Sequence, residues 1–251
     1  MNTQQQKSFK VLLIGDSCLD IFVYGEVKRL NPEAPVPILN YTKTETRQGM
    51  AWNVYNNLRA FNLDVKMLTN EEKIIKTRYI DEKSNQQILR VDEEVKCKPM
   101  NYEISNEKYD AVVISDYDKG FISNQTLFDI PYKVKCPVFI DTKKTTFPEY
   151  NCYVKINDLE YSKLNKKYDN LIITHGAKGA EYDEVLYPGE KVNVYDVVGA
   201  GDTFLAGLVY GFLKYGTIQQ AIPFANRAAA IAVSNSGTYV LTKEDVQNLC
   251  N

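Results

Sequence analysis

Four short apolar runs, each followed by polar or turn residues, constrain the fold of this chain more than any other feature. They cover residues 11–15, 111–115, 138–140 and 171–174. Continuous apolar runs of this length are typical of strands that are buried on both faces, as in a parallel sheet. Because ligands bind beyond the carboxyl ends of the strands in open α/β sheets, the polar residues that follow these runs are the first candidates for chemistry.

Two segments do not fit an alternation of strands and helices. Residues 19–41 carry aromatic side chains around the turn-rich NPEAPVP, and residues 73–92 alternate apolar and polar positions without a helix signal. They predict about four strands of a small antiparallel sheet, which is enough for a lid but thin for an independent domain. The C-terminal third shows helical spacing over residues 199–215, 217–234 and 242–249.

The expected architecture is therefore of the α/β class, with a mostly parallel central sheet flanked by helices and a small antiparallel β lid. We expect one domain over residues 1–251, whose lid strands come from about 19–48 and 73–92. A chain of this length can bury about three quarters of its unfolded surface, so a single large core needs no covalent staples.

Composition excludes several classes of protein. The chain has 251 residues, a net charge of −2 and 44% hydrophobic residues, which argues against disorder and against a strongly basic nucleic-acid-binding protein. No apolar stretch approaches the roughly 20 residues that span a bilayer, and the polar N-terminus lacks a signal-peptide core. We therefore expect a cytoplasmic protein with neither nucleic acid nor membrane as a partner.

Cysteine and histidine usage restricts the chemistry further. Five cysteines without a CxxC pair suggest free thiols in a reducing compartment. The only histidine is His175, which excludes a histidine-rich metal site. A Ser-His-Asp triad would be possible only if it used this histidine.

The strongest local motif is DVVGAGDTF at residues 196–204, where a glycine-rich turn opens an apolar helix. Gly199 and Gly201 allow tight backbone geometry, and the helix start adds unpaired amides and a positive dipole end. Together with Ala200 they form an anion site suited to phosphate. Asp202 lies inside this site and could accept a proton from an attacking hydroxyl, which is the combination that phosphoryl transfer to an alcohol requires.

Other glycine motifs do not explain this segment. A P-loop needs Lys-Ser or Lys-Thr after its last glycine, and a dinucleotide fingerprint needs a third glycine where Phe204 stands. The simpler interpretation, an ordinary glycine-rich helix entry with Asp202 as a capping charge, stays open on the motif alone.

Two further groups of residues lie at the ends of predicted elements. Asp16 and Asp20 follow the first strand and could hold sugar hydroxyls, although an ordinary turn with caps explains them as well. Gly49 and Asn53 lie at the predicted opening of the next helix, where glycine allows a ligand to approach and asparagine offers an amide. Taken alone, each pair could also have only a structural role, as part of a turn or of a helix start.

Asn157 and Glu160 follow another short strand. Asn157 is a good helix N-cap, and Glu160 three residues later fits a capping-box partner. The functional interpretation places Glu160 near a magnesium ion or its waters, because hard cations prefer carboxylate oxygens. Both interpretations stay open.

These residues resemble the ribokinase-like (phosphofructokinase B-type) carbohydrate kinases, and among them the D-glycero-D-manno-heptose 7-phosphate kinases. The family's D-x-x-G-A-G-D signature matches residues 196–202, and its N-x-x-E motif matches residues 157–160. Five collinear blocks are closer to the heptose kinases: GDSCLD, RLNPEAPVP, SNQQILRVD, SDYDKG and YDVVGAGDT. They extend over almost the whole chain, so chance agreement is a poor explanation.

The resemblance implies a role for each matching residue. Asp202 would deprotonate the sugar hydroxyl, and Gly199, Ala200 and Gly201 would form the anion hole for the phosphoryl group of ATP. The residues expected on the sugar side are Asp16, Asp20, Gly49 and Asn53. The residues expected near Mg²⁺ or the nucleotide are Asn157, Glu160, Thr174, Gly176, Gly179 and Asn226, with Glu160 as the metal residue. Charged residues that end two central strands are Asp116, Lys119, Asp141 and Lys143; the lysines would bind a substrate phosphate or ATP, or remain solvated loop charges.

The chain also departs from the family pattern. Met50 and Trp52 stand where the family's sugar loop usually has small residues, so they would either reshape the acceptor pocket or face the core or a dimer lid. Helical segments are expected to be missing between residues 68 and 73 and between 164 and 169. No nucleotidyltransferase domain of the kind fused to some heptose kinases is expected to follow.

The resemblance implies an ATP-dependent kinase for a phosphorylated heptose or similar sugar. Two alternatives stay open: a catalytically degenerate family member that binds nucleotide or sugar phosphate, and a kinase for another alcohol such as a nucleoside or hexose phosphate. The apolar lid strands, with Ile21, Phe22, Val23, Val36 and Ile38, need cover, and a homodimer through the lid would supply it.

Overall fold

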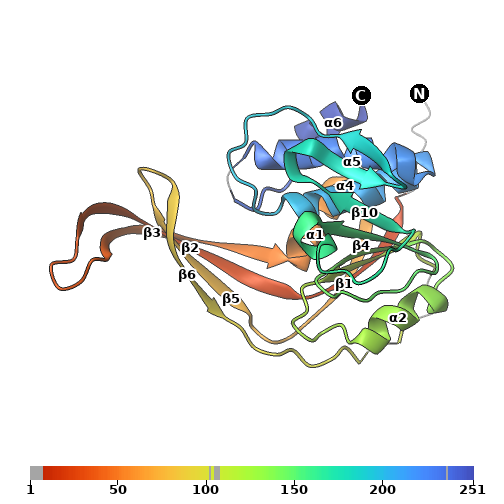
Figure 1. Ribbon diagram of the computed structural model, residues 1–251, viewed down its shortest axis with the longest axis horizontal. Coiled ribbons are helices and arrows are strands. Elements are labelled where there is room, and N and C mark those ends of the chain that lie inside the picture. The colour runs from red at the N-terminus through yellow and green to blue at the C-terminus, as the bar shows by residue number, and fades with distance from the viewer. Residues whose placement is uncertain (1–7, 102, 105–107, 236) are drawn as a thin grey trace.

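Two sheets organise the computed structural model, which describes residues 8–101, 103–104, 108–235 and 237–251. An eight-stranded sheet with helices forms the body, and a four-stranded sheet projects from it as a long arm (Figure 1). The strand order of the body sheet is β12-β11-β10-β9-β8-β7-β1-β4, and that of the arm is β3-β2-β5-β6. We call the arm the lid.

The body strands are β1 Lys10–Gly15, β4 Asp64–Thr69, β7 Ala111–Asp116, β8 Val138–Thr142, β9 Cys152–Asn157, β10 Leu171–Thr174, β11 Gly179–Tyr182 and β12 Val185–Pro188. The lid strands are β2 Ser17–Leu30, β3 Pro37–Met50, β5 Ile75–Asp81 and β6 Gln86–Glu93. The helices are α1 Ala51–Ala60, α2 Asn124–Lys133, α3 Asp158–Tyr161, the 3₁₀ helix η1 Gly176–Lys178, α4 Ala200–Tyr215, α5 Ile218–Val233 and α6 Lys243–Cys250.

The four apolar runs form strands β1, β7, β8 and β10, and these pair in parallel with their sheet neighbours β4 and β9. This confirms the predicted parallel core. Strands β11 and β12 add an antiparallel edge that the sequence pattern did not predict, because both are only four residues long.

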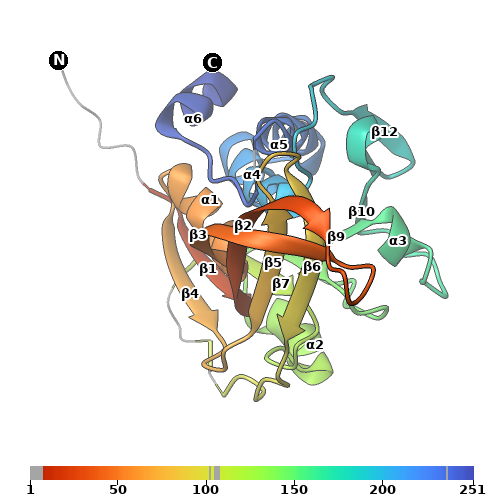
Figure 2. The ribbon, with the colours of Figure 1, turned by 90° about the vertical axis from the view of Figure 1, so that its left-hand side faces the viewer.

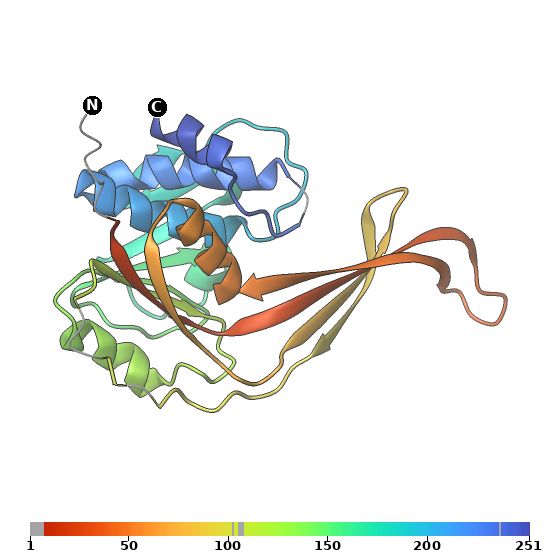
Figure 3. The same cartoon turned by 180° about the vertical axis from the view of Figure 1, so that it is seen from behind.

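Both faces of the body sheet are buried, but they are covered differently. Alternate side chains of β1 enter opposite core clusters, Leu13 with Phe204 of α4 and Ile14 with Leu127 of α2. Helices α4, α5 and α6 lie over one face, and α2 lies on the other (Figures 1 and 3). The two expected gaps are confirmed, since β4 leads into the lid without a helix and α3 has a single turn.

The start of the lid differs from the expectation. Only Asp16 separates β1 from β2, so the lid begins at Ser17 instead of at about residue 19, and Asp20 lies in a lid strand and not in the ordinary turn that was the alternative. Likewise Gly49 belongs to the end of β3, and helix α1 begins only at Ala51. The reason is the pairing of β2 with β3, which extends to Ser17 opposite Met50 and holds both segments in strand geometry.

The lid consists of two antiparallel hairpins, as expected, but the strands that join them, β2 and β5, run parallel. Both strands follow neighbouring parallel body strands, β1 and β4, so they leave the body in the same direction (Figure 2). No helix in the described part of the chain is long and apolar enough to span a membrane.

Candidate active site

The glycine-rich turn before α4 forms the centre of the site. Gly199 has φ 79°, which favours glycine, and a Cβ atom there would lie 2.6 Å from Nδ2 of Asn53. Asp196 fixes the turn, because its carboxylate accepts hydrogen bonds from the backbone N–H groups of Val198 (3.0 Å) and Gly237 (2.9 Å). The first amides of the helix therefore sit in a rigid turn, as the anion-site interpretation requires.

Asp202 lies in the first turn of α4, and its side chain points inward. Asn53 donates a hydrogen bond to Oδ2 (3.0 Å), and the Tyr117 hydroxyl donates one to Oδ1 (2.8 Å). The residue is 5% exposed. Burial raises the pKa of Asp202 to about 6, against the opposing effect of the two donors. A carboxylate with a pKa this close to neutrality is suited to accept and return a proton.

A buried ion pair lies beneath the glycine turn. Lys155 of β9 binds Asp141 of β8 at 2.8 Å, and both side chains are almost fully buried. A Cβ atom on Gly201 would lie 2.8 Å from the Lys155 amine, so the missing side chain leaves room for this cation at the anion site. Lys155 was not among the residues expected in the site; the signal that could have found it is a lysine within the otherwise largely apolar strand CYVKIN.

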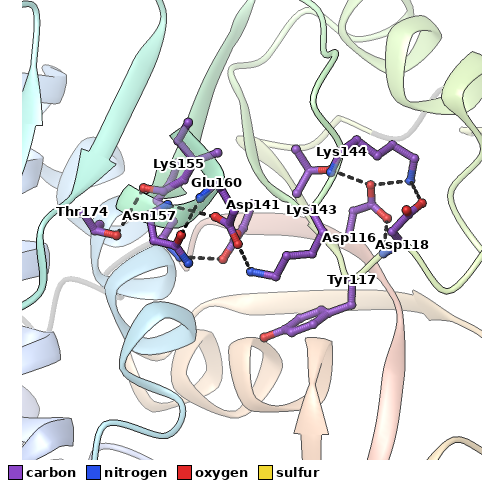
Figure 4. Close-up of polar contacts among 12 residues, drawn as sticks. Asp116, Tyr117, Asp118, Asp141, Lys143, Lys144, Lys155, Asn157, Glu160 and Thr174 are labelled. Atoms are coloured by element: carbon purple, nitrogen blue, oxygen red, sulfur yellow. Dashed lines mark hydrogen bonds and ion pairs between the residues drawn. The ribbon is translucent and has the colours of Figure 1, made fainter. Parts of the chain in front are cut away.

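Asn157 and Glu160 form the capping box of α3. The Asn157 side chain accepts from the Glu160 backbone N–H (2.9 Å), and Glu160 Oε2 accepts from the Asn157 backbone N–H (2.9 Å). Glu160 Oε1 also forms an ion pair with Lys143 (Figure 4). The capping-box interpretation of this motif is therefore confirmed. The Glu160–Lys143 ion pair lies at the carboxyl ends of β8 and β9.

A cavity of about 680 Å³, within the size range of small-molecule sites, lies between the carboxyl end of β10, the β11–β12 hairpin and helix α5. Its lining includes Lys155, Ala200 and Gly201, so it opens onto the glycine-rich turn before α4. It also includes five of the residues expected on the nucleotide side: Asn157, Thr174, Gly176, Gly179 and Asn226. Asn226 donates its amide to the carbonyls of Tyr187 and Pro188, so it ties α5 to β12 at the cavity wall.

The residues expected on the sugar side lie where β1 and the lid meet. Asp16 is fully buried, and its Oδ2 accepts from the backbone N–H groups of Tyr117 (2.7 Å) and Lys119 (3.3 Å), whereas Oδ1 has no partner among the described residues. A Cβ atom on Gly49 would lie 2.1 Å from Asp20 Oδ2, so glycine leaves room for that carboxylate. The unpaired oxygen is a ready acceptor for a ligand hydroxyl.

Two of the charged residues at strand ends have structural partners. Asp116 is buried and accepts from Lys144 (2.6 Å) and Thr142 (2.7 Å), and Lys119 pairs with Glu94 (2.6 Å). Their charges are therefore already matched within the protein.

The side chains of Met50 and Trp52 pack in different surroundings. Met50 is 4% exposed, has φ 56° and packs in the core cluster that contains Leu12 and Ile14. Trp52 packs edge-on against Tyr55, with ring centroids 5.1 Å apart. Of the two alternatives for these residues, the core position holds for Met50.

Known proteins resemble this chain along nearly its whole length. The family model described as pfkB family carbohydrate kinase matches residues 155–245. The bifunctional protein HldE of Nitratiruptor sp. is 31% identical over 95% of this chain and 64% of its own length. HldE of Helicobacter pylori strain P12 is 30% identical over 96% of this chain and 67% of its own length. The chain thus spans about two thirds of the length of the curated relatives it matches.

The alignment with the Nitratiruptor protein runs over 297 positions, more than the 251 residues of this chain. The relative therefore carries additional residues inside the matched region, in agreement with the missing helical segments. Among solved structures, ribokinase from Thermotoga maritima has a TM-score of 0.71 at 14% identity, covering 96% of this chain and 99% of its own. Arabidopsis thaliana ribokinase, solved with ribose and ATP, has a TM-score of 0.68 at 15% identity, with 97% and 99% covered.

The body sheet with its projecting lid, and a buried carboxylate in a glycine-rich helix entry beside a cavity, define a phosphotransferase of the ribokinase fold. The chain belongs to the pfkB family of carbohydrate kinases. Family and fold were both predicted from the motifs in the sequence.

Proposed function

We propose that the protein is an ATP-dependent sugar kinase that transfers the γ-phosphoryl group to a hydroxyl of a phosphorylated sugar, D-glycero-D-manno-heptose 7-phosphate. The observation that carries this proposal is Asp202, buried at the N-terminus of α4 with its pKa raised by burial to about 6. The resemblance to HldE proteins supports a heptose phosphate as acceptor.

In this mechanism Asp202 removes the proton from the acceptor hydroxyl. Asn53 and Tyr117 hold its two oxygens, so the carboxylate is oriented before the acceptor arrives. The proton passes to the carboxylate as the acceptor oxygen forms its bond to the γ-phosphorus, and the bond from that phosphorus to the β,γ-bridging oxygen breaks. The products are the phosphorylated acceptor and ADP.

The amides of Gly199, Ala200 and Gly201 would stabilise the charge on the moving phosphoryl group, and the Lys155 amine lies close enough to assist them. The nucleotide would occupy the 680 Å³ cavity that opens onto these residues. When bound, Mg²⁺ would neutralise charge on the phosphate oxygens.

The residues present fit such an ion. Mg²⁺ is usually held by one or two carboxylates together with substrate phosphates and water, so a cage of protein ligands is not required. Glu160 lies in the single turn of α3 that follows the cavity-lining Asn157, and it would contact the ion or its waters while paired with Lys143. In the described part of the chain no cluster of three or more metal-binding side chains is present.

We also propose that two copies associate through the lid in the cytoplasm. Of the lid residues expected to need cover, Phe22 is already buried, whereas Val36 is 48% exposed. Leu89 and Val91 of the lid are 54% and 41% exposed, and a second lid would cover such side chains. All five cysteines are free thiols, which favours a reducing compartment.

An ADP-release assay with ATP and Mg²⁺ across heptose 7-phosphate, hexose phosphates, unphosphorylated sugars and nucleosides tests the proposal. We expect turnover of heptose 7-phosphate above all others, and a loss of at least a thousandfold in Asp202→Asn while ATP still binds. Preference for another acceptor would revise the substrate. Binding of ATP without turnover of any acceptor would favour the degenerate, non-catalytic alternative.

A further inference from the structure

The β7 turn, residues 116–119 at the carboxyl end of strand β7, supplies hydrogen-bond donors to two carboxylates of the site. The Tyr117 hydroxyl donates to Asp202 (2.8 Å), and the Tyr117 backbone N–H donates to Asp16 (2.7 Å). The backbone N–H of Lys119 also donates to Asp16 (3.3 Å). The directions of both carboxylates therefore depend on where this turn is held.

Lys144, from the segment that follows strand β8, holds the β7 turn. Its amine donates to Asp116 Oδ2 (2.6 Å) and pairs with Asp118 Oδ1 at 3.1 Å (Figure 4). It also donates to the backbone carbonyl of Ile122 (3.0 Å), just beyond the turn. Asp118 has φ 57°, a left-handed conformation that costs free energy in a residue with a side chain, so the contact with Lys144 helps to keep the turn in this shape.

These contacts saturate the amine of Lys144. A lysine ammonium has three N–H donors, and here three acceptors take them. The side chain is 9% exposed, and it is absent from the described residues that line the 680 Å³ cavity. Lys144 is thus placed to hold groups of the protein itself and not to contact a nucleotide or an acceptor.

The ion pair between Lys144 and Asp116 is buried and well surrounded by hydrogen bonds. The hydroxyl of Thr142 donates to Asp116 Oδ2 (2.7 Å), and the backbone N–H of Lys143 donates to the Asp116 carbonyl (3.1 Å). Buried charges that are paired in this way lose much free energy when one partner moves away. The pair therefore fixes the position of the β7 turn relative to the end of β8.

From this geometry we propose that Lys144 is a positioning residue for phosphoryl transfer, because it holds the β7 turn where Tyr117 meets both Asp202 and Asp16. The inference rests on the proposed function of Asp202 as the base. A cation bonded to this part of the chain thereby sets the direction of the base and of the acceptor-side aspartate together. The competing explanation is that Lys144 stabilises the fold and does nothing for the reaction.

Other groups face Asp202 from other elements. They are Cys18 of β2, Asn53 of α1, Asp141 of β8, Lys143 after β8 and Lys155 of β9. Among the groups around Asp202, Tyr117 is the member of the β7 turn. An effect of Lys144 that passes through the turn must therefore disappear when the Tyr117 hydroxyl is absent.

The first test replaces the anchor. Lys144→Met removes it, and Lys144→Met combined with Asp116→Asn does so without leaving a buried unpaired charge, so the second variant should fold even if the first does not. We expect kcat to fall by roughly tenfold to a hundredfold, while KM for ATP stays within about twofold. Because the hydrogen bond from Tyr117 lowers the pKa of Asp202, the acidic limb of kcat/KM should move up by about one pH unit.

Lys166→Met is the control, since it removes a lysine that pairs with Glu149 at 2.6 Å on the exposed surface. It should match the wild type in kcat and in the acidic limb. A loss of stability in the Lys144 variants with the limb unmoved would mean a role in folding alone and would overturn the proposal.

The second test adds the same double change to Tyr117→Phe. The acidic limb should not move again in this background, whereas the free energy of unfolding should fall as much as it does with the tyrosine present. A further shift of equal size would show that Lys144 acts on Asp202 by another route, for example through Lys143, and would also overturn the proposal.

A third measurement does not depend on turnover. Carboxyl NMR titration without substrate, with the Asp202 signal assigned through Asp202→Asn, should show a higher pKa for Asp202 in the double variant than in the wild type. A protein that shows this shift but phosphorylates no acceptor would refute the proposed function and retain Lys144 as the residue that positions Asp202. An active kinase whose Asp202 titration is unchanged in the double variant would overturn the role of Lys144 and leave the proposed function standing.

Discussion

The hydroxyl of Tyr117 donates a hydrogen bond of 2.8 Å to Oδ1 of Asp202, although 85 residues separate them in the chain. Tyr117 follows strand β7, and Asp202 opens helix α4, so the contact joins the sheet edge to the anion site. Because burial and the neighbouring Asp202 charge raise the pKa of Tyr117 well above its ordinary value, the phenol remains a donor. It therefore stabilises the ionised form of the proposed base.

Replacing this donor should move the pH dependence of catalysis. Asp202 faces Asn53 of α1, Asp141 of β8 and Lys155 of β9 as well as Tyr117, and the tyrosine hydrogen bond lowers its pKa. Tyr117→Phe should therefore shift the acidic limb of kcat/KM to higher pH, with the larger activity loss below pH 7. The exposed Tyr132→Phe on α2 serves as the control. An unmoved limb, or one shifted to lower pH, would contradict the assignment.

The buried carboxylate should also make stability depend on pH. The pKa of Asp202 is about 6 in the folded protein against 3.8 ordinarily, so the folded state holds the proton more tightly. Stability is thus greatest below the unfolded pKa and is lost as pH rises through the folded one. From pH 3.5 to 7 the wild type should lose up to about 3 kcal/mol relative to Asp202→Asn. Urea unfolding at several pH values measures this, and parallel curves for the two proteins would argue against it.

Adding one methyl group at Gly201 should lower kinase activity without lowering the stability of the fold. In Gly201→Ala the new Cβ would lie 2.8 Å from the Lys155 amine and displace it from the site. Alanine favours the helix by up to about 1 kcal/mol, so the protein should unfold no more easily than the wild type. Turnover should nevertheless fall at least tenfold with a higher KM for ATP. Normal kinetics would show that Lys155 has no role in the reaction.

The proposed dimer predicts a defined effect of one lid residue. Leu89 on β6 is 54% exposed, and Leu186 on β12 of the body is 52% exposed. Leu89→Asp should convert a dimer into a monomer in sedimentation velocity at micromolar concentration, because a charge would be buried in the contact. Leu186→Asp should leave the dimer intact. A wild-type protein that sediments as a monomer would refute the lid contact directly.

The extent to which these features could be predicted differs between local and long-range structure. The parallel strands, the three C-terminal helices and the glycine turn before Asp202 follow from apolar runs, helical spacing and turn residues that lie next to one another in the chain. Residues 17–20, for which a turn was one of two alternatives, lie in β2, because β2 pairs with β3 as far as Ser17 opposite Met50 and the local pattern could not show this contact.

The sequence by itself therefore determined the α/β class, the family and the place of Asp202 in the glycine-rich entry of α4, since each is encoded within a short window. The tertiary structure alone decided which groups surround Asp202. Asn53 of α1 lies 149 residues from Asp202 along the chain, and Lys155 reaches the same place from strand β9 of the body sheet. Such contacts depend on the order and direction of the strands, which residue periodicity does not specify.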